Sequence, residues 1–396
     1  MTPGARLSAA MELLDAVLAG EPAERALTRW ARASRFAGSK DRAAVRDLVF
    51  DGLRRRRSLG WIAGAETGRG IVLAGQATEG VDLDALGFGG PHALAPLTEA
   101  ERARLTAPPP FPSDPVRLDY PDILDAPLRA ALGPAFEASL SAMQARAPVD
   151  LRANALRGTR AQAIAALATE GVVAEAHPLA PHALRVAGTP RGLATSRAYA
   201  EGLVEPQDVS SQLVAALCEA RPGQTVLDYC AGGGGKTLAL AADMGGQGEL
   251  YAWDANPRRM ADLPERARRA GARVRTLDAQ GLARRAGACD LVLADAPCTG
   301  TGAWRRKPEG KWRITPEFLA GFPPLQDQIL DAASACVRPG GALAYATCSI
   351  LRVENEERAA AFLARHPDWR LEAERRIGLV DGGDGFFFAR FRAPTA

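Results

Sequence analysis

The stretch LVLADAPCTGTG, residues 291–302, decides the fold of this chain. Its apolar start predicts a buried strand that ends near Asp295, Pro297 and Cys298, and the Gly-Thr-Gly segment that follows predicts a loop. A carboxylate and a thiol are therefore expected together at the carboxyl end of a central strand. Ligands of open α/β sheets bind at that edge.

Regular strand and helix character surrounds this stretch from Gly223 onward. The sequence predicts strands at residues 225–229, 249–253, 273–277, 290–294, 342–346, 370–373 and 386–391. Helices long enough for right-handed crossovers separate the first five strands, which indicates a mostly parallel sheet covered on both faces. A GGDG turn at residues 382–385 precedes the last strand, so an antiparallel partner is expected at the end of the sheet.

A glycine-rich turn, DYCAGGGGKT at residues 228–237, follows the first of these strands. Glycines let a ligand approach the backbone, and the helix amino terminus offers N–H groups to an anionic part of the ligand. The turn could serve a dinucleotide, a phosphate or S-adenosylmethionine. The P-loop pattern GxxxxGK[ST] does not fit, because Ala231 stands where its first glycine belongs.

Two acids after later strands narrow this choice. Asp254 follows the second strand at a spacing that lets a carboxylate accept the ribose hydroxyls of a nucleoside. Asp278 follows the third strand, where it can hold an adenine amino group. Each acid alone is more often an ordinary turn residue, but together with the turn they predict a pocket for an adenosyl cofactor.

Two cysteines end strands on the same ligand side of the sheet. Cys298 follows the fourth strand and Cys348 the fifth. A thiolate is a nucleophile when nearby positive charge or a helix terminus lowers its pKa. Addition of a thiolate to C6 of cytosine would let C5 attack a cofactor methyl group, and Asp295 near N3 could stabilise the adduct by hydrogen bonding.

These motifs resemble those of the RNA (cytosine-5)-methyltransferases with two active-site cysteines. The matching segments are DYCAGGGGKT, DAPCTGTG and YATCSI, with QDVSSQ upstream and ENE at residues 354–356 downstream. The resemblance implies a Rossmann-like catalytic domain that uses S-adenosyl-L-methionine. DNA cytosine methyltransferases are similar only in their Pro-Cys nucleophile, so RNA rather than DNA is the expected substrate.

The resemblance also assigns roles to individual residues. It implies Cys348 as the nucleophile and Cys298 as the residue that assists product release. Asp295, expected near N3, is a further candidate catalytic residue. Lys236 is a candidate for lowering the thiolate pKa or orienting the base. The residues expected to bind the cofactor are Cys230, Ala231, Gly232, Gly233, Gly234, Gly235, Lys236, Asp254, Arg259, Asp278 and Asp295. The family usually has CAAPGGKT, and Gly232 and Gly233 replace its second Ala and its Pro, which should make the unliganded turn more flexible.

The amino-terminal region predicts helices. Apolar residues recur at helical spacing over residues 7–17 and 45–53, and SKDR at 39–42 is expected to join these segments. SKDR and the following VRDLVFDGLR resemble the NusB-like RNA-binding domain that is fused to the methyltransferase in bacterial 16S ribosomal RNA enzymes of the RsmB type. Residues 1–130 are therefore expected to form an all-α NusB-like domain.

Less regular patterns lie between these regions. Residues 67–119 are rich in Gly and Pro and predict short helices and loops. Strands are expected at 151–156 and 183–186, with helices at 159–170 and 191–201. Residues 131–205 are thus interpreted as a small α/β module that helps form the RNA cleft, and residues 206–396 as the Rossmann-like catalytic domain.

Two charged stretches have two interpretations each. The first stretch is the run of arginines at 54–57, and the second is the basic segment at 305–313 with the neighbouring Trp304 and the interleaved Trp312. Both could be solvated surface. Their density of positive charge also suits RNA phosphates, and the tryptophans suit an unstacked base.

Composition limits the remaining possibilities. The 396 residues are 47% hydrophobic, enough for two or three domains, and the net charge of +3 says little about partners. No apolar stretch could span a membrane, and Glu12 and Asp15 argue against a secretory signal. The six cysteines form no CxxC pair, so neither a metal site nor disulfides are expected, and Cys218, Cys289 and Cys336 are interpreted as buried hydrophobic residues.

The sequence therefore predicts a cytoplasmic, monomeric methyltransferase of cytosine C5 in 16S ribosomal RNA. One alternative keeps the chemistry and changes the substrate to transfer RNA. The other is an inactive RNA-binding or ribosome-assembly factor, which only the GGGG turn supports. Cofactor binding distinguishes this second alternative from an enzyme.

Overall fold

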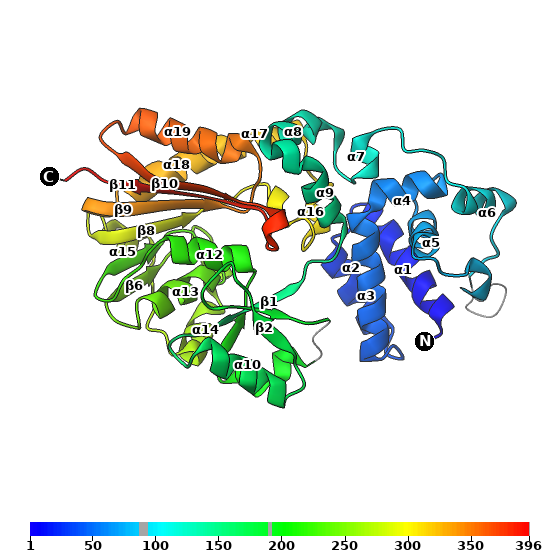
Figure 1. The fold of residues 1–396 in the computed structure, drawn as a ribbon, viewed down its shortest axis with the longest axis horizontal. Helices are drawn as coiled ribbons and strands as arrows, with labels where there is room; N and C mark the ends of the chain where they lie inside the picture. Colours follow the sequence, from blue (N-terminus) through cyan, green and yellow to red (C-terminus); the bar gives the residue numbers. More distant parts are fainter. Residues whose placement is uncertain (87–93, 189–191, 396) are drawn as a thin grey trace. The chain divides into compact units, whose positions relative to one another are not determined.

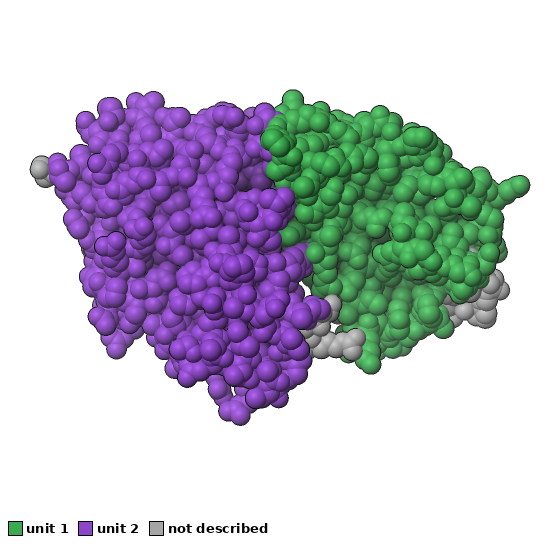
Figure 2. All heavy atoms as spheres, viewed as in Figure 1, with its two compact units in different colours: residues 1–129, 133–146, 304–314 green, residues 130–132, 147–303, 315–396 purple. Residues whose placement is uncertain are grey.

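The computed structural model describes residues 1–86, 94–188 and 192–395 (Figure 1). The chain divides into two compact units (Figure 2). Unit 1 consists of Met1–Arg129, Gly133–Arg146 and Trp304–Ile314, and unit 2 consists of Ala130–Leu132, Ala147–Ala303 and Thr315–Ala396.

Unit 1 is helical, and its core lies where α1, α3, α4 and α5 meet. Its larger helices are α1 (Pro3–Leu18), α2 (Ala23–Ala33), α3 (Ser39–Arg54), α4 (Arg56–Ala63), α5 (Gly68–Thr78), α6 (Glu99–Thr106), α8 (Asp125–Leu132, whose last three residues group with unit 2) and α9 (Phe136–Gln144). The short elements are η1 (Leu83–Leu86), α7 (Asp114–Arg117), η2 (Asp122–Leu124), η3 (Gly133–Ala135) and α16 (Pro308–Lys311). Leu14, Val49 and Ile71 are fully buried in this core.

One expectation for this unit needs correction, and another, that of short helices and loops after residue 67, is confirmed among the described residues. Residues 39–42 do not join two helices but form the first turn of α3, where the Asp41 carboxylate accepts the Gly38 N–H. The weakly patterned region after residue 67 contains α5, whose residues Ile71 to Ala74 are buried in the core. The glycines of α5 make this helix hard to recognise in the sequence. Gly68 is required, because a Cβ at this position would lie 2.0 Å from the Met11 carbonyl oxygen.

The segment Trp304–Ile314 belongs to unit 1 although it follows the Cys298 loop directly in sequence. Lys311 Nζ donates to the Arg54 carbonyl oxygen (2.9 Å), and Trp312 Nε1 donates to that of Leu53 (2.7 Å). Trp304, Arg305 and Lys311 are buried. The interpretation of this segment as an RNA contact is therefore wrong for these three side chains, which are buried, and hydrogen bonds of the Lys311 and Trp312 side chains join the segment to α3.

The arginine run at residues 54–57 likewise has intramolecular partners. Arg54 is buried and donates to the Arg305 carbonyl oxygen (2.7 Å). The other three donate to the Thr78 hydroxyl, the Glu66 carboxylate and the Tyr120 carbonyl oxygen, respectively. The run lies at the junction of α3 and α4, and its guanidinium groups are hydrogen-bonded to acceptors within unit 1.

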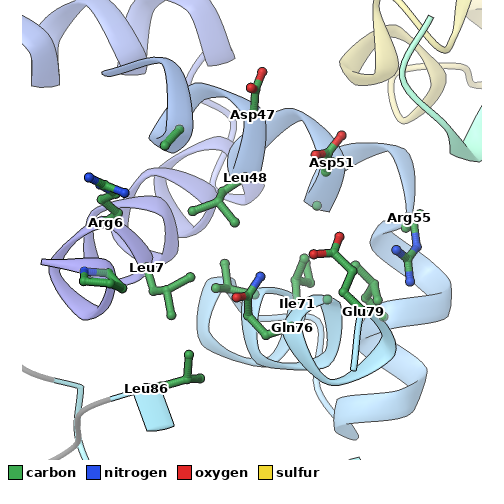
Figure 3. A pocket seen from close by; sticks show the side chains of 16 residues that line it. Arg6, Leu7, Asp47, Leu48, Asp51, Arg55, Ile71, Gln76, Glu79 and Leu86 are labelled. Atoms are coloured by element: carbon green, nitrogen blue, oxygen red, sulfur yellow. The ribbon is translucent and has the colours of Figure 1, made fainter. Parts of the chain in front are cut away.

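A cavity of about 350 Å³ lies between α1, α3 and α5 in unit 1 (Figure 3). Leu7, Leu48 and Ile71 form part of its apolar lining, and Asp51 and Arg55 contribute charge.

The first sheet of unit 2 has the strand order β2-β3-β1-β4 and is antiparallel. Its elements are β1 (Val149–Ala153), α10 (Arg160–Thr169), β2 (Ala174–Ala176), β3 (Ala183–Val186), η4 (Leu193–Thr195), α11 (Arg197–Ala200) and β4 (Val204–Pro206). The helix expected at 191–201 is confirmed only in part among the described residues, because extended Ser196 separates η4 from α11 and caps the latter. Residue 191 lies outside the described residues.

The second sheet has the order β10-β11-β9-β8-β5-β6-β7. Its strands are β5 (Thr225–Asp228), β6 (Glu249–Ala252), β7 (Arg275–Thr276), β8 (Cys289–Asp295), β9 (Val337–Thr347), β10 (Arg370–Ile377) and β11 (Phe386–Arg392). All predicted strands are confirmed with shifted ends. The first five are parallel, and the predicted antiparallel end of the sheet consists of β11 between β9 and β10.

Helices cover both faces of this sheet: α12 and α13 lie on one side, α18 and α19 on the other (Figure 1). The helices are α12 (Val209–Leu217), α13 (Gly235–Asp243), α14 (Leu263–Ala270), α15 (Ala279–Ala283), α17 (Pro316–Ala320), α18 (Phe322–Ser334) and α19 (Glu356–Arg365). Alternate residues of the central strands face the two cores, as Val226 and Leu227 do. Within the described residues, no helix combines the length and apolarity that a membrane span requires.

Candidate active site

The two cysteines after β8 and β9 come together at the carboxyl edge of the large sheet. The strands are adjacent and parallel, with Asp295 paired to Ala346, so the loops that follow them start side by side. Cys298 Sγ lies 3.4 Å from Cys348 Sγ. The hydrogen bond to Cys348, burial and the charges of Cys348 and Glu354 raise the pKa of the Cys298 thiol well above its usual range. The raised pKa favours the protonated form of Cys298, and either sulfur can be the donor in the contact between the two.

A buried carboxylate lies behind the two cysteine loops. Glu354, at the end of η7 (Arg352–Glu354), is fully buried. Its Oε1 accepts the Thr299 N–H (2.9 Å) and the Gln326 amide (3.1 Å). Its Oε2 accepts the hydroxyls of Thr299 and Ser349. One side chain thus holds the residue after Cys298, the residue after Cys348 and helix α18.

Asn355 extends this hydrogen-bond network. Its Oδ1 accepts the Thr347 hydroxyl (2.6 Å), and its Nδ2 donates to the Ser349 carbonyl oxygen (2.9 Å). Cys348 is therefore flanked on both sides by residues bound to Asn355. In the sequence, Glu354 and Asn355 stand out only as part of the ENE motif, and no local pattern indicates that they hold the cysteine loops.

Gly302 fixes the end of the Cys298 loop against two other segments. Its N–H donates to the Cys348 carbonyl oxygen (2.9 Å), and its carbonyl accepts the Gly385 N–H (2.9 Å). A Cβ at this position would lie 2.0 Å from the Gly385 carbonyl oxygen. The last glycine of DAPCTGTG is thus required by a close backbone approach.

An ion pair lies at the same edge of the sheet. Lys236, in the first turn of α13, places Nζ 2.7 Å from Asp295 Oδ2 and 5.0 Å from the Phe386 ring centre. Burial favours the neutral amine, but the charge and hydrogen bond of Asp295, with the charge of Cys348, outweigh burial and raise the pKa of Lys236. The residue therefore supplies a permanent positive charge within electrostatic reach of the Cys348 sulfur.

The glycine-rich turn after β5 is tied to the end of β6. Gly232 adopts a φ of 51°, and its N–H donates to Asp254 Oδ2 (2.9 Å). Arg259 pairs with the same carboxylate at 3.1 Å, and the Asn256 N–H donates to Oδ1 (2.9 Å). Gly234 is also left-handed, with a φ of 81°. These conformations hold a chain of consecutive glycines at the amino terminus of α13.

Sheet order brings the predicted cofactor residues into one row. The neighbouring strands β8, β5, β6 and β7 end, in that order, at Asp295, the glycine-rich turn, Asp254 and Asp278. Asp278 accepts the Gly281 N–H (2.6 Å) as the cap of α15. The remaining turn residues predicted for the cofactor are Cys230, Ala231, Gly233 and Gly235, which occupy the connection from β5 to α13. Burial raises the pKa of Cys230, so this thiol is protonated. Carboxylates and open backbone in this order fit an adenosyl cofactor.

Sequence comparison assigns this site to a family. Residues 215–392 match the family described as 16S rRNA methyltransferase RsmB/F, and residues 120–191 match the ferredoxin-like domain of the same group. A ribosomal RNA small subunit methyltransferase B from Salmonella typhi is 32% identical over 306 residues, which are 74% of this chain and 71% of that protein. The chain belongs to the RsmB/F methyltransferase family.

Other relatives agree with membership of the RsmB/F family. The enzyme of the same description from Klebsiella pneumoniae is 35% identical over 257 residues, or 62% of this chain, and the chain spans only 59% of that relative. The solved structure of PH0851 has a similar fold, with a TM-score of 0.77 at 24% identity and coverage of 99% of both chains. The RsmB/F match includes both cysteine loops and the glycine-rich turn.

Proposed function

We propose that this chain is an S-adenosyl-L-methionine-dependent methyltransferase that modifies C5 of a cytosine in RNA, specifically 16S ribosomal RNA. The observation that carries the proposal is the 3.4 Å approach of the Cys298 and Cys348 sulfur atoms at the sheet edge that also holds the Lys236–Asp295 pair. Membership of the RsmB/F family supports the same substrate class.

Cys348 is the nucleophile in this proposal. Its thiolate forms a bond to cytosine C6, and the electron pair of the C5–C6 double bond moves toward C5. Lys236 favours the thiolate by its charge, and Asp295 stabilises the adduct by hydrogen bonding near N3. When bound, S-adenosyl-L-methionine supplies the methyl group that C5 accepts.

Cys298 acts when the product leaves. Loss of the C5 proton to solvent restores the C5–C6 double bond, and the C6–sulfur bond breaks with its electron pair returning to Cys348. A thiol with a raised pKa keeps its proton and can donate a hydrogen bond to the departing sulfur. Removal of Cys298 should therefore slow breakdown of the adduct more than its formation.

Cofactor binding is assigned to the row of strand ends described above. The turn at residues 230–236 receives the cofactor backbone, Asp254 the ribose, Asp278 the adenine, and Arg259 holds Asp254 in place. We further assign residues 1–130 to a NusB-like RNA-binding domain, 131–205 to a module that helps form the RNA cleft, and 206–396 to the catalytic domain. A single chain contains every residue that the proposal uses.

Methyl transfer from labelled cofactor to unmodified small-subunit RNA tests the proposal. Wild type should label a cytosine, Cys348→Ala should be inactive, and Cys298→Ala should accumulate an RNA–protein adduct that survives denaturation. Cys336→Ala is the matched control, because this cysteine is buried between α18 and β9, and should remain active.

Other outcomes contradict parts of the proposal. An adduct in Cys348→Ala but not in Cys298→Ala would exchange the roles of the two cysteines. Labelling of transfer RNA without labelling of ribosomal RNA would change the substrate. A purified wild-type protein that binds no cofactor would identify a binding factor and not an enzyme.

A further inference from the structure

Residues 21–46 of unit 1, which span α2, the loop after it and the first half of α3, are strongly basic. They contain seven Arg and Lys residues against three Asp and Glu, a net charge of +4, whereas the whole chain has a net charge of +3. Positive charge is therefore concentrated on this part of unit 1.

The three carboxylates of the segment are already paired. The ion pairs are Glu21–Arg29 at 2.7 Å, Glu24–Arg46 at 2.6 Å and Asp41–Arg6 at 2.8 Å. The exposed cations Arg32, Arg35 and Lys40 have no ion-pair partner among the described residues. Arg42 donates to the Ala37 carbonyl oxygen (3.0 Å), which orients its guanidinium without neutralising it. These four exposed cations are available to an anion from outside the chain.

An aromatic side chain follows Arg35 in the loop between α2 and α3. Phe36 is 76% exposed, the largest exposure of any large hydrophobic residue that the structure describes. The loop that carries it is held without burial of the ring, since the Ala37 N–H donates to the Ser34 carbonyl oxygen (3.0 Å). Arg32, Arg35 and Arg42 line a hollow on the surface beside this loop. An exposed ring beside unpaired cations suits a ligand with both phosphates and unstacked bases.

The cavity of Figure 3 has a different character. Asp47, Asp51 and Glu79 contribute three carboxylates to its lining, against Arg6 and Arg55. Phosphates would be repelled there, so the cavity is not a comparable site for RNA.

We propose that Arg32, Arg35, Phe36, Lys40 and Arg42, here called the α2–α3 surface, bind a single-stranded segment of the substrate RNA. The four cations contact phosphates, and Phe36 stacks on an unpaired base. This inference rests on the proposed RNA methyltransferase function and assigns its RNA contact to particular residues of unit 1.

Binding of full-length protein to poly(U) RNA, measured over a range of salt concentrations, tests the surface. The triple variant Arg32→Gln, Arg35→Gln, Lys40→Gln should weaken binding about tenfold or more and reduce the slope of log K against log salt by about 2. The triple variant Arg273→Gln, Arg284→Gln, Arg375→Gln is the matched control, because it removes the same charge from exposed positions of unit 2.

Phe36→Ala separates stacking from charge. It should weaken poly(U) binding several-fold and leave the salt slope unchanged, and it should leave binding to inorganic polyphosphate, which has no bases, at the wild-type level. Equal loss on polyphosphate and poly(U) would overturn the stacking role.

Methylation kinetics separate failure of this inference from failure of the proposed function. A wild-type protein that methylates no RNA contradicts the function itself. If wild type methylates RNA, the triple variant should raise KM for RNA about tenfold with kcat unchanged. An unchanged KM, or an equal rise in the control variant, would overturn the assignment of the surface. Unchanged RNA binding with lost binding to polyglutamate would assign the surface to an acidic protein instead.

Discussion

Glu354 is a buried residue that holds the loops of both Cys298 and Cys348. A buried carboxylate is stable only when donors satisfy it, and here the donors come from the loops that carry Cys298 and Cys348 and from α18. It accepts hydrogen bonds from Thr299, Ser349 and Gln326. It therefore positions the two sulfur atoms through the residues next to them. Its negative charge also helps raise the pKa of Cys298.

Removal of this carboxylate should lower kcat and leave cofactor binding intact. Glu354→Ala leaves the Thr299 N–H without this acceptor and leaves the Gln326 amide with only the Pro297 carbonyl oxygen, and each unsatisfied buried donor costs about 1–3 kcal/mol. We expect kcat for methyl transfer to fall about 100-fold with an unchanged KM for the cofactor, and Glu354→Gln, which keeps one acceptor oxygen, to lose only about tenfold.

The exposed Glu357→Ala on α19 is the control and should behave as wild type in the same assay. Wild-type kcat in folded Glu354→Ala would show that the cysteine loops keep their positions without this residue. Circular dichroism of each variant establishes that it is folded.

At the scale of elements, the site depends on two adjacent strands and a turn from a distant part of the chain. Parallel pairing of β8 with β9 starts the two cysteine loops side by side. The turn before β11 then closes on the first loop, where Gly385 and Gly302 approach through their backbones. Antiparallel addition of β11 to β9 is thus part of what holds Cys298 near Cys348.

Gly302→Ala should disrupt this contact. The new Cβ would lie 2.0 Å from the Gly385 carbonyl oxygen, so one of the two backbones must move. We expect a loss of about 1–3 kcal/mol in the free energy of unfolding, measured in urea, and at least about a tenfold loss of methyl transfer.

Gly310→Ala is the matched control, because no described atom lies within 4 Å of the position that a new Cβ would occupy and the φ of this residue is not left-handed. It should leave stability and activity unchanged. A Gly302→Ala variant as active as this control would mean that the turn before β11 does not position the Cys298 loop.

At the scale of the whole chain, one segment of the methyltransferase sequence is built into the helical unit. Residues 304–314 follow the Cys298 loop and end in unit 1, where Lys311 is fully buried. Its ammonium lies 5.6 Å from the Trp304 ring centre and 4.8 Å from that of Trp312. Burial lowers the pKa of Lys311 to about 8, below its usual value of 10.5.

This lowered pKa predicts a pH dependence of stability. Between pH 8 and 10.5 the unfolded chain holds the Lys311 proton and the folded chain does not, so raising the pH through this window favours the folded state. Lys311→Met lacks this effect. The free energy of unfolding of wild type should therefore rise relative to that of Lys311→Met by up to about 1.4 kcal/mol for each pH unit between pH 8 and 10.5.

Chemical denaturation of both proteins at several pH values measures this difference. Lys307→Met, at an exposed position of the same segment, should follow wild type at every pH. Parallel curves for wild type and Lys311→Met would contradict a lowered pKa.

The amino-acid sequence was sufficient for the large sheet, its parallel and antiparallel parts, and the ends of the strands that carry Asp254, Asp278, Asp295, Cys298 and Cys348. Apolar periodicity and glycine turns are local properties, so they can be read without the fold. The motifs were also sufficient to indicate the family, which the comparisons confirm.

Long-range contacts decided the rest. The 3.4 Å approach of the two sulfur atoms depends on strand order, and the roles of Glu354 and Gly302 depend on hydrogen bonds between segments far apart in sequence. The charge of Lys311 suggested exposure, yet tertiary packing buries it against backbone carbonyls and aromatic rings. Residue type states what a side chain can do, whereas burial and partners, which only the folded chain supplies, determine what it does.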